Sequence, residues 1–255
     1  MTAIIGIVLM GVAAGVWYLR QKSLDKAMNI KYHQTSKVAD VMQSHKDIAD
    51  SLGEGNFSMM VEVNGMAHAD QPLQAEHSGR PALYYRAEVI REYEEVVETT
   101  DSEGRRKREV QRNSETISSN EAYVPFTLND GSGSIKVDME GAEKISQQGI
   151  DRFEAEAPAG YRFSGNSKTI GYRYREYIIP DGVKLYVLGE ATDRRGGGLT
   201  IVKPSEKKEN FIVSTKSEEE LVRNVEGSAF AYKIGSIVSG VVGVVLLIAG
   251  ILGLF

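Results

Sequence analysis

Residues 234–255 read IGSIVSGVVGVVLLIAGILGLF, a run without a charged side chain. At about 1.5 Å of rise per residue, a helix of this length spans about 33 Å, close to the hydrocarbon core of a bilayer at ~30 Å. The core helix of a soluble domain is the alternative, but such a helix normally keeps a polar face. The run therefore predicts a transmembrane helix, which we place at 228–255.

A second apolar run, residues 3–19, ends in two aromatic residues that are followed by basic ones. This order is typical of a membrane helix that meets the lipid headgroups. A cleaved signal peptide is the alternative, but it would need a basic leader and a small-residue cleavage site. We therefore predict a first membrane helix at 1–20. The interface residues expected for the two helices are Trp17, Tyr18, Arg20, Lys22, Tyr232 and Lys233.

The basic residues near the two runs all lie on their inner sides. Arg20, Lys22, Lys26 and Lys31 follow the first run, and no Lys or Arg lies beyond either outer end. The two runs predict a two-pass protein of a bacterial-type inner or plasma membrane, or of an organelle, and the positive-inside rule predicts its orientation. Residues from about 20 to 233 would lie in the cytoplasm, and both termini outside.

Both runs contain small residues at the four-residue spacing that permits close helix packing. Helix contact within the pair, or between copies in a homo-oligomer, is one interpretation; the ordinary enrichment of glycine in membrane helices is the other. The predicted packing residues are Gly11, Gly15, Gly235, Ser239 and Gly243.

The composition between the runs is that of a soluble domain. Charged residues make up 25% of the chain and the formal net charge is −5, which does not favour a nucleic-acid partner. The chain contains no cysteine, so disulfides, thiol nucleophiles and cysteine-ligated zinc are excluded within it. We predict no cofactor, no metal and no catalytic residue.

The stretch 21–55 reads as a helical arm with a break near residues 32–36. Apolar residues from Val38 to Leu52 recur at spacings of three and four, which indicates one buried helical face. His45 lies on that stripe, and we interpret it as a half-buried core histidine. Gly53 and Gly55 end the helix.

From residue 56 to 227 the pattern changes to β-strands. Alternating residues and Gly/Asn/Asp turns predict many short strands, a partly closed barrel or paired sheets, and an overall α+β class. Ser217 and Glu220 predict a capping box that opens a short helix to about Val225. The expected strands are 57–67, 83–97, 107–117, 123–129, 134–139, 170–179, 183–191, 199–203 and 211–214.

Strands 83–97 and 107–117 would form a long hairpin around a turn at 101–104. Its basic cluster, 105–108, could bind anionic lipid or nucleic acid. The structural interpretation is a row of ion pairs across the strands, with Glu98 opposite Lys107.

Several short motifs, in their order, resemble the GIDE or "beside a membrane" (BAM) domain of the mitochondria-anchored ubiquitin and SUMO ligases (MULAN/MAPL type) and their chloroplast relatives. They are VEVNGMA at 61–67, Tyr84-Tyr85, Val124-Pro125-Phe126 and YVLGEA at 186–191, between two membrane helices.

The resemblance implies a membrane-flanked recognition or regulatory domain. In the ligases a zinc-binding RING domain follows the second helix, and this sequence has no counterpart. We therefore expect a noncatalytic interaction or scaffold module that binds an unknown protein beside the bilayer. The resemblance also implies a domain on the outer side, whereas the charges favour the cytoplasm.

The alternative function is an accessory subunit or a hydrolase-like enzyme. Its site would lie in the long polar loop 155–168, although we find no nucleophile, base or metal motif there.

Overall fold

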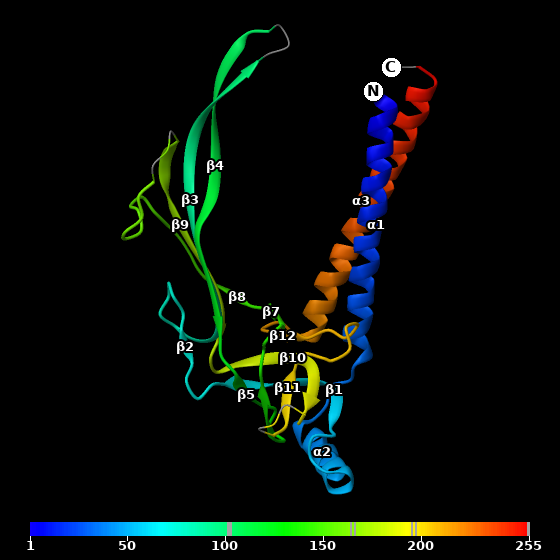
Figure 1. Ribbon diagram of the computed structural model, residues 1–255, viewed down its shortest axis with the longest axis vertical. Helices are drawn as coiled ribbons and strands as arrows, with labels where there is room; N and C mark the ends of the chain where they lie inside the picture. The colour runs from blue at the N-terminus through cyan, green and yellow to red at the C-terminus, as the bar shows by residue number, and fades with distance from the viewer. Residues whose placement is uncertain (101–103, 164, 166, 195, 197, 254–255) are drawn as a thin grey trace.

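The computed structural model describes residues 1–255 except 101–103, 164, 166, 195, 197, 254 and 255. It is of the predicted α+β class, with two β-sheets and terminal helices apolar enough to cross a membrane (Figure 1). The helices are α1 (Thr2–Tyr32), α2 (Val38–Leu52) and α3 (Glu218–Ile251). The strands are β1 (Ser58–His68), β2 (Leu73–Gln74), β3 (Pro81–Thr100), β4 (Arg106–Tyr123), β5 (Phe126–Asn129), β6 (Ser134–Val137), β7 (Glu143–Ile145), β8 (Gln147–Glu154), β9 (Lys168–Pro180), β10 (Val183–Thr192), β11 (Thr200–Val202) and β12 (Ile212–Ser214).

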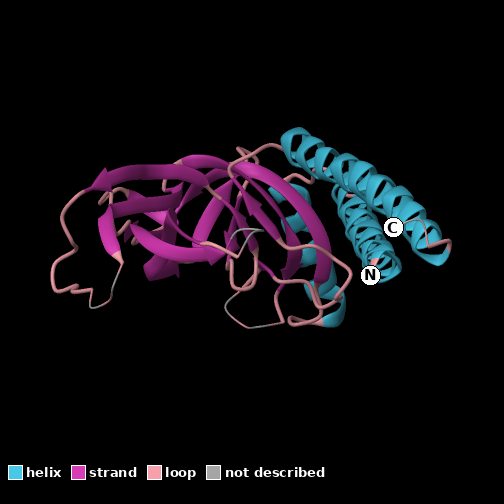
Figure 2. Ribbon diagram, turned by 90° about the horizontal axis from the view of Figure 1, so that it is seen from above, coloured by secondary structure: helices cyan, strands magenta, loops and turns pink. Residues whose placement is uncertain are grey.

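The helices α1 and α3 lie side by side and antiparallel, so both chain termini lie at one end of the pair (Figures 1 and 2). α1 continues past the apolar run to Tyr32, where the backbone becomes extended at His33. The break expected near residues 32–36 is therefore present, and α2 begins at Val38.

The capping box of α3 is confirmed. Ser217 accepts the backbone N–H of Glu220, and the Glu220 side chain accepts the N–H of Ser217. The expected end of a short helix near Val225 is wrong, because α3 continues without interruption to Ile251. The intervening sequence contains no proline, and a single glycine such as Gly227 costs a helix only about 1 kcal/mol.

A closed ring of five strands forms the barrel. β1 pairs with β5, β5 with β6, β6 with β11, β11 with β10, and β10 again with β1. Two motifs of the sequence, VEVNGMA and YVLGEA, pair directly in this ring, with Val61 opposite Gly189 and Val63 opposite Val187. β12 and β7 extend the sheet from β10, and the largest buried apolar cluster fills the interior.

The second sheet has the order β2-β3-β9-β8, with β4 on β3. β3 and β4 form the predicted long hairpin, a ribbon that projects toward the same end as the chain termini (Figure 1). Its register differs by one residue from the expected one, since Glu98 faces Arg108 and Thr99 faces Lys107. The loop length sets this register, and most of the predicted turn, 101–103, lies outside the described residues.

The ion-pair interpretation of the hairpin is confirmed at two positions, of which Arg108 belongs to the basic cluster. Arg108 contacts Glu98 at 3.0 Å and Arg112 contacts Glu94 at 3.1 Å across the ribbon, whereas Lys107 contacts Glu109 of its own strand.

The strands β2, β7 and β8 were not expected from the sequence. β8 reads QQGIDRFE and leaves its side chains exposed or half-buried, so its sequence carries no alternation of apolar and polar residues. The predicted strand at 123–129 is split by Val124 and Pro125, because Tyr123 ends β4 and β5 begins at Phe126.

Candidate functional site

The predicted interface residues gather at one depth of the helix pair. Trp17 and Tyr18 are exposed on α1, and the Arg20 guanidinium lies 4.7 Å from the Trp17 ring centroid. Arg20 and Lys233 line the same small cavity between α1 and α3. Lys22 is exposed and Tyr232 is half-buried. The two helices thus present aromatic and basic side chains together, as membrane helices do at the headgroup level.

Of the predicted packing residues, Gly235 and Gly243 lie against the other helix, whereas Gly11 and Gly15 do not. Gly243 lies against Gly6, where a Cβ on Gly6 would come within 2.7 Å of the Gly243 carbonyl oxygen, and Gly235 lies near Val16. A Cβ on Gly11 or Gly15 would meet no described atom within 4 Å. Ser239 is half-buried. The close approach within the pair therefore uses Gly6, which the GxxxG pattern did not select.

Polar contacts fix the base of α1 to the barrel. Lys26 pairs with Glu143 of β7 at 2.5 Å, and the Asn29 amide donates to Glu209 at 2.8 Å. His33 contacts the same Glu209 oxygen at 3.1 Å. The pKa of Glu209 is lowered, chiefly by the hydrogen bond from Asn29. Burial works to raise it, and the contact with His33 lowers it further. These contacts couple the direction of the helix pair to the β-domain.

A buried carboxylate lies at the same junction. Glu62 of β1 is fully buried and accepts the Thr35 hydroxyl at 2.6 Å and the Tyr186 hydroxyl at 3.1 Å. Burial first, and then the Glu62 carboxylate, raise the pKa of Tyr186 above its ordinary value. Both Glu62 oxygens are satisfied, so the group serves to fasten the link between α1 and α2.

The N-terminus of α2 is capped from outside the helix. Its own N-cap residue, Lys37, makes no side-chain capping bond. Asp130 of the β5–β6 turn accepts the N–H of Val38 at 2.9 Å, and Ser132 accepts that of Ala39 at 3.1 Å. Burial works to raise the pKa of Asp130, but hydrogen bonds from Val38, Ser132 and Gly133 outweigh it and lower the pKa.

Asp193, just after β10, holds the other end of α2. It contacts the His45 ring at 3.1 Å and accepts the backbone N–H groups of Gly55 and Phe57. The same hydrogen bonds overcome burial and lower the pKa of Asp193. His45, which also packs edge-on against Phe57, is half-buried, and its ring bonds a carboxylate.

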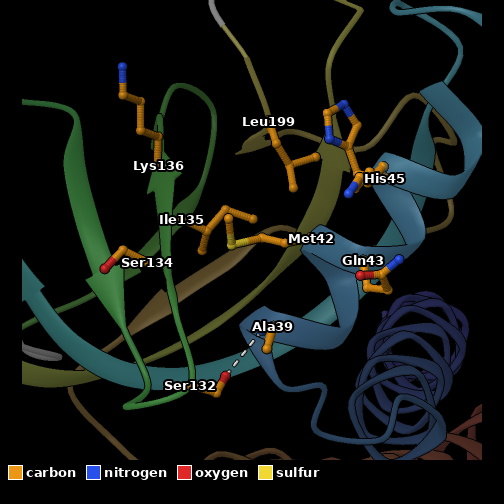
Figure 3. Close-up of a pocket in the computed structure, with 10 residues that line it drawn as sticks. Ala39, Met42, Gln43, His45, Ser132, Ser134, Ile135, Lys136 and Leu199 are labelled. Carbon is orange, nitrogen blue, oxygen red and sulfur yellow. Dashed lines mark hydrogen bonds between the residues drawn. The ribbon is translucent and has the colours of Figure 1, made fainter. Parts of the chain in front are cut away.

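Between these two attachments lies a groove of about 710 Å³, which we call the α2–β6 groove. Met42 and Ile135 point toward one another across it, and Leu199 points in from a third segment (Figure 3). The lining residues are Ala39, Met42, Gln43, His45, Lys46, Ser132, Ser134, Ile135, Lys136 and Leu199. The walls of this groove lie far apart in the chain, so no local pattern predicts it. The available signal in the sequence was a helix without a capping side chain of its own.

A second cavity, of about 470 Å³, lies beside the loop proposed for the alternative function. Pro158, Ala159 and Tyr161 of that loop line it together with His77 and Tyr174. The His77 ring packs on Tyr174, and its Nε2 lies 3.3 Å from the Glu88 carbonyl oxygen. Residues 164 and 166 of the loop lie outside the described part of the chain. Among the described residues, no group of three or more His, Asp or Glu side chains could hold a metal ion.

The chain is similar to one protein family and to two plant proteins. The family model "GIDE: E3 Ubiquitin ligase" matches residues 94–248, from the end of β3 through most of α3. E3 ubiquitin-protein ligase SP1 of Arabidopsis thaliana is 27% identical over 194 residues, 74% of this chain and 54% of the relative. E3 ubiquitin-protein ligase SPL1 of the same plant is 29% identical over 143 residues, 53% of this chain and 42% of the relative. The chain thus spans about half the length of these relatives. No solved structure matches.

Proposed function

Because this chain belongs to the GIDE family of E3 ubiquitin ligases, we propose that it is a membrane-anchored, noncatalytic protein-interaction module that uses the α2–β6 groove to dock a protein. The position of the groove supports the proposal. The groove opens beside α2, at the end of the molecule opposite the tips of α1 and α3 (Figure 1). A junction with polar contacts at Glu62, Glu143 and Glu209 lies between the two, which supports a groove held away from the bilayer.

The noncatalytic part rests on the chemistry of the described residues. A cysteine-ligated zinc module cannot form within a chain that contains no cysteine. The groove has hydroxyls at Ser132 and Ser134, but the His45 ring contacts Asp193, and among the described residues neither hydroxyl is hydrogen-bonded to a histidine. A nucleophile paired with its base is therefore not in place.

A cross-linking experiment tests docking. A photo-reactive amino acid is placed at Met42 in the full chain and, as a control, at Val96 on the exposed ribbon. Irradiation of the native membranes should give a defined protein adduct at position 42 and none at position 96. Equal labelling at both positions, or none at 42, would reject the groove as the docking site.

Ubiquitin transfer tests the noncatalytic part. The full chain, in nanodiscs with activating enzyme, conjugating enzymes, ubiquitin and ATP, should give no ubiquitin conjugates above a control without the chain. Conjugates that depend on the chain would overturn this part of the proposal while leaving docking intact.

We propose that the domain lies in the cytoplasm, because Arg20, Lys22, Lys26 and Lys31 follow the apolar run of the first helix on its inner side. Single cysteines at Asp50, an exposed residue of α2 far from the membrane helix tips, and in a short extension after Phe255 report this directly in a chain without native cysteine. An impermeant maleimide on intact cells should label only the extension. Labelling of Asp50→Cys alone would put the domain on the outer side.

A further inference from the structure

We propose that the α2–β6 groove binds an acidic protein segment that presents large apolar side chains. This inference rests on the proposed docking function and names its partner class. The helix α2 has one face toward the barrel core and another toward the groove. Val38 and Val41 face the barrel core, whereas Ala39, Met42, Gln43 and Lys46 form a second stripe that faces the groove. Their spacing of three, four and seven residues puts them on one side of the helix.

The groove has an apolar floor without an occupant. Met42 is 47% exposed although it points toward Ile135, and Leu199 lies beside them (Figure 3). Methionine is flexible and polarizable, so it adapts to apolar side chains of different shape. A cavity of about 710 Å³ accommodates several such side chains.

Two lysines stand at the rim of the groove. Lys46 lies on the helix side and Lys136 on the strand side, and no Asp or Glu is among the lining residues of the groove. Lys136 also lines a neighbouring cavity that contains Asp70 and Asp138. Neither lysine makes an ion pair with a described residue.

The whole chain has 35 acidic residues against 30 Lys and Arg, so a lining with two lysines and no carboxylate runs against the overall charge. The carboxylates at the two ends of the groove, Asp130 and Asp193, are already bonded to α2 and to the residues that follow it. An occupant with carboxylates supplies the missing partners.

The position and the lining of the groove favour a protein over lipid headgroups or a nucleic acid as the anionic occupant. α2 lies at the end of the molecule away from the tips of the membrane helices, so the headgroups of that bilayer do not reach it (Figure 1). A single-stranded nucleic acid would need stacking aromatic rings, and the lining residues include no Phe, Tyr or Trp.

The test uses the full chain in nanodiscs of uncharged lipid and two synthetic peptides. One peptide of about 12 residues, a helix of ~18 Å, alternates glutamate pairs with leucine pairs. The other has glutamine in place of every glutamate. We expect saturable binding of the glutamate peptide by fluorescence anisotropy, weakened by added salt, and much weaker binding of the glutamine peptide.

Variants then assign the contact. Lys46→Gln and Lys136→Gln should each weaken binding about two- to fivefold, and together about tenfold. Lys184→Gln, at an exposed lysine of β10 outside the groove, should leave binding unchanged. Met42→Gln should weaken it through the apolar floor, and circular dichroism spectra should show that each variant is folded.

The outcomes separate the two proposals. A Met42 cross-link to protein that persists at full yield in the Lys46→Gln/Lys136→Gln variant would overturn the acidic partner but leave docking at the groove intact. Equal binding of the two peptides would overturn the acidic partner in the same way. A missing Met42 cross-link, by contrast, rejects the docking function itself.

Discussion

The Asp130 carboxylate, in the turn between β5 and β6, accepts the backbone N–H of Val38 at 2.9 Å and so caps a helix that lies 92 residues earlier in the chain. The first N–H groups of a helix have no partner within it, and α2 has no capping side chain of its own. The cap therefore fixes one wall of the α2–β6 groove to the other.

Asp130→Ala should destabilise the chain by about 1–2 kcal/mol, the usual cost of losing an N-cap. Hydrogen exchange should rise in α2 before it rises in the barrel. Asp50→Ala, at an exposed residue of the same helix, is the matched control and should change stability by less than about 0.5 kcal/mol. Equal effects of the two substitutions would contradict the capping role.

The attachment of α2 should weaken in acid. The pKa values of Asp130 and Asp193 are both lowered in the folded chain. A lowered folded-state pKa gives stability that is complete above the unfolded pKa of about 3.9 and is lost as the pH falls through the folded value. Thermal melts of the solubilised chain should therefore fall steeply below about pH 4. The Asp130→Asn/Asp193→Asn variant should show a shallower fall, and an unchanged slope would argue against these two groups.

Removing the Tyr186 hydroxyl should destabilise the chain, because the buried Glu62 carboxylate would lose a hydrogen bond. Tyr186→Phe leaves the Glu62 Oε2 atom without its hydrogen bond, and an unsatisfied buried polar atom costs about 1–3 kcal/mol. The melting temperature should fall accordingly. Tyr177→Phe, at a half-buried tyrosine of β9 whose hydroxyl bonds to no described residue, is the control and should have little effect.

The helix pair should form a specific disulfide. A Cβ on Gly240 would lie 3.7 Å from the Ala13 Cβ, within the usual range of about 3.5–4.5 Å for a disulfide. Ala13→Cys/Gly240→Cys should therefore cross-link within one chain when membranes are oxidised. Failure to cross-link in membranes would contradict this packing.

Gly11→Cys provides the matched control, because a Cβ there meets no described atom of the same chain within 4 Å. Paired with Gly240→Cys, it should give no intrachain disulfide. Gly11→Cys alone also tests the predicted homo-oligomer, since only a second copy could complete its disulfide. A cross-linked dimer would support that prediction, and a monomer would count against contact through the Gly11–Gly15 face.

The sequence by itself determined the elements whose patterns are local. Two long uncharged runs specify helices that can cross a membrane. A segment inside lipid has no water to bond its backbone groups, and a helix bonds them within the segment. Strand alternation and the Ser217–Glu220 spacing predict the β-rich middle and the start of α3 in the same way. The absence of cysteine excludes a class of chemistry whatever the fold.

Only the tertiary structure decided what depends on contacts between distant residues. It brings Asp130 to Val38 and Met42 to Ile135, and it makes Gly6 rather than Gly11 the close-packing residue of α1. Periodicity reports which side of an element is buried, but which other segment covers that side depends on how the whole chain packs.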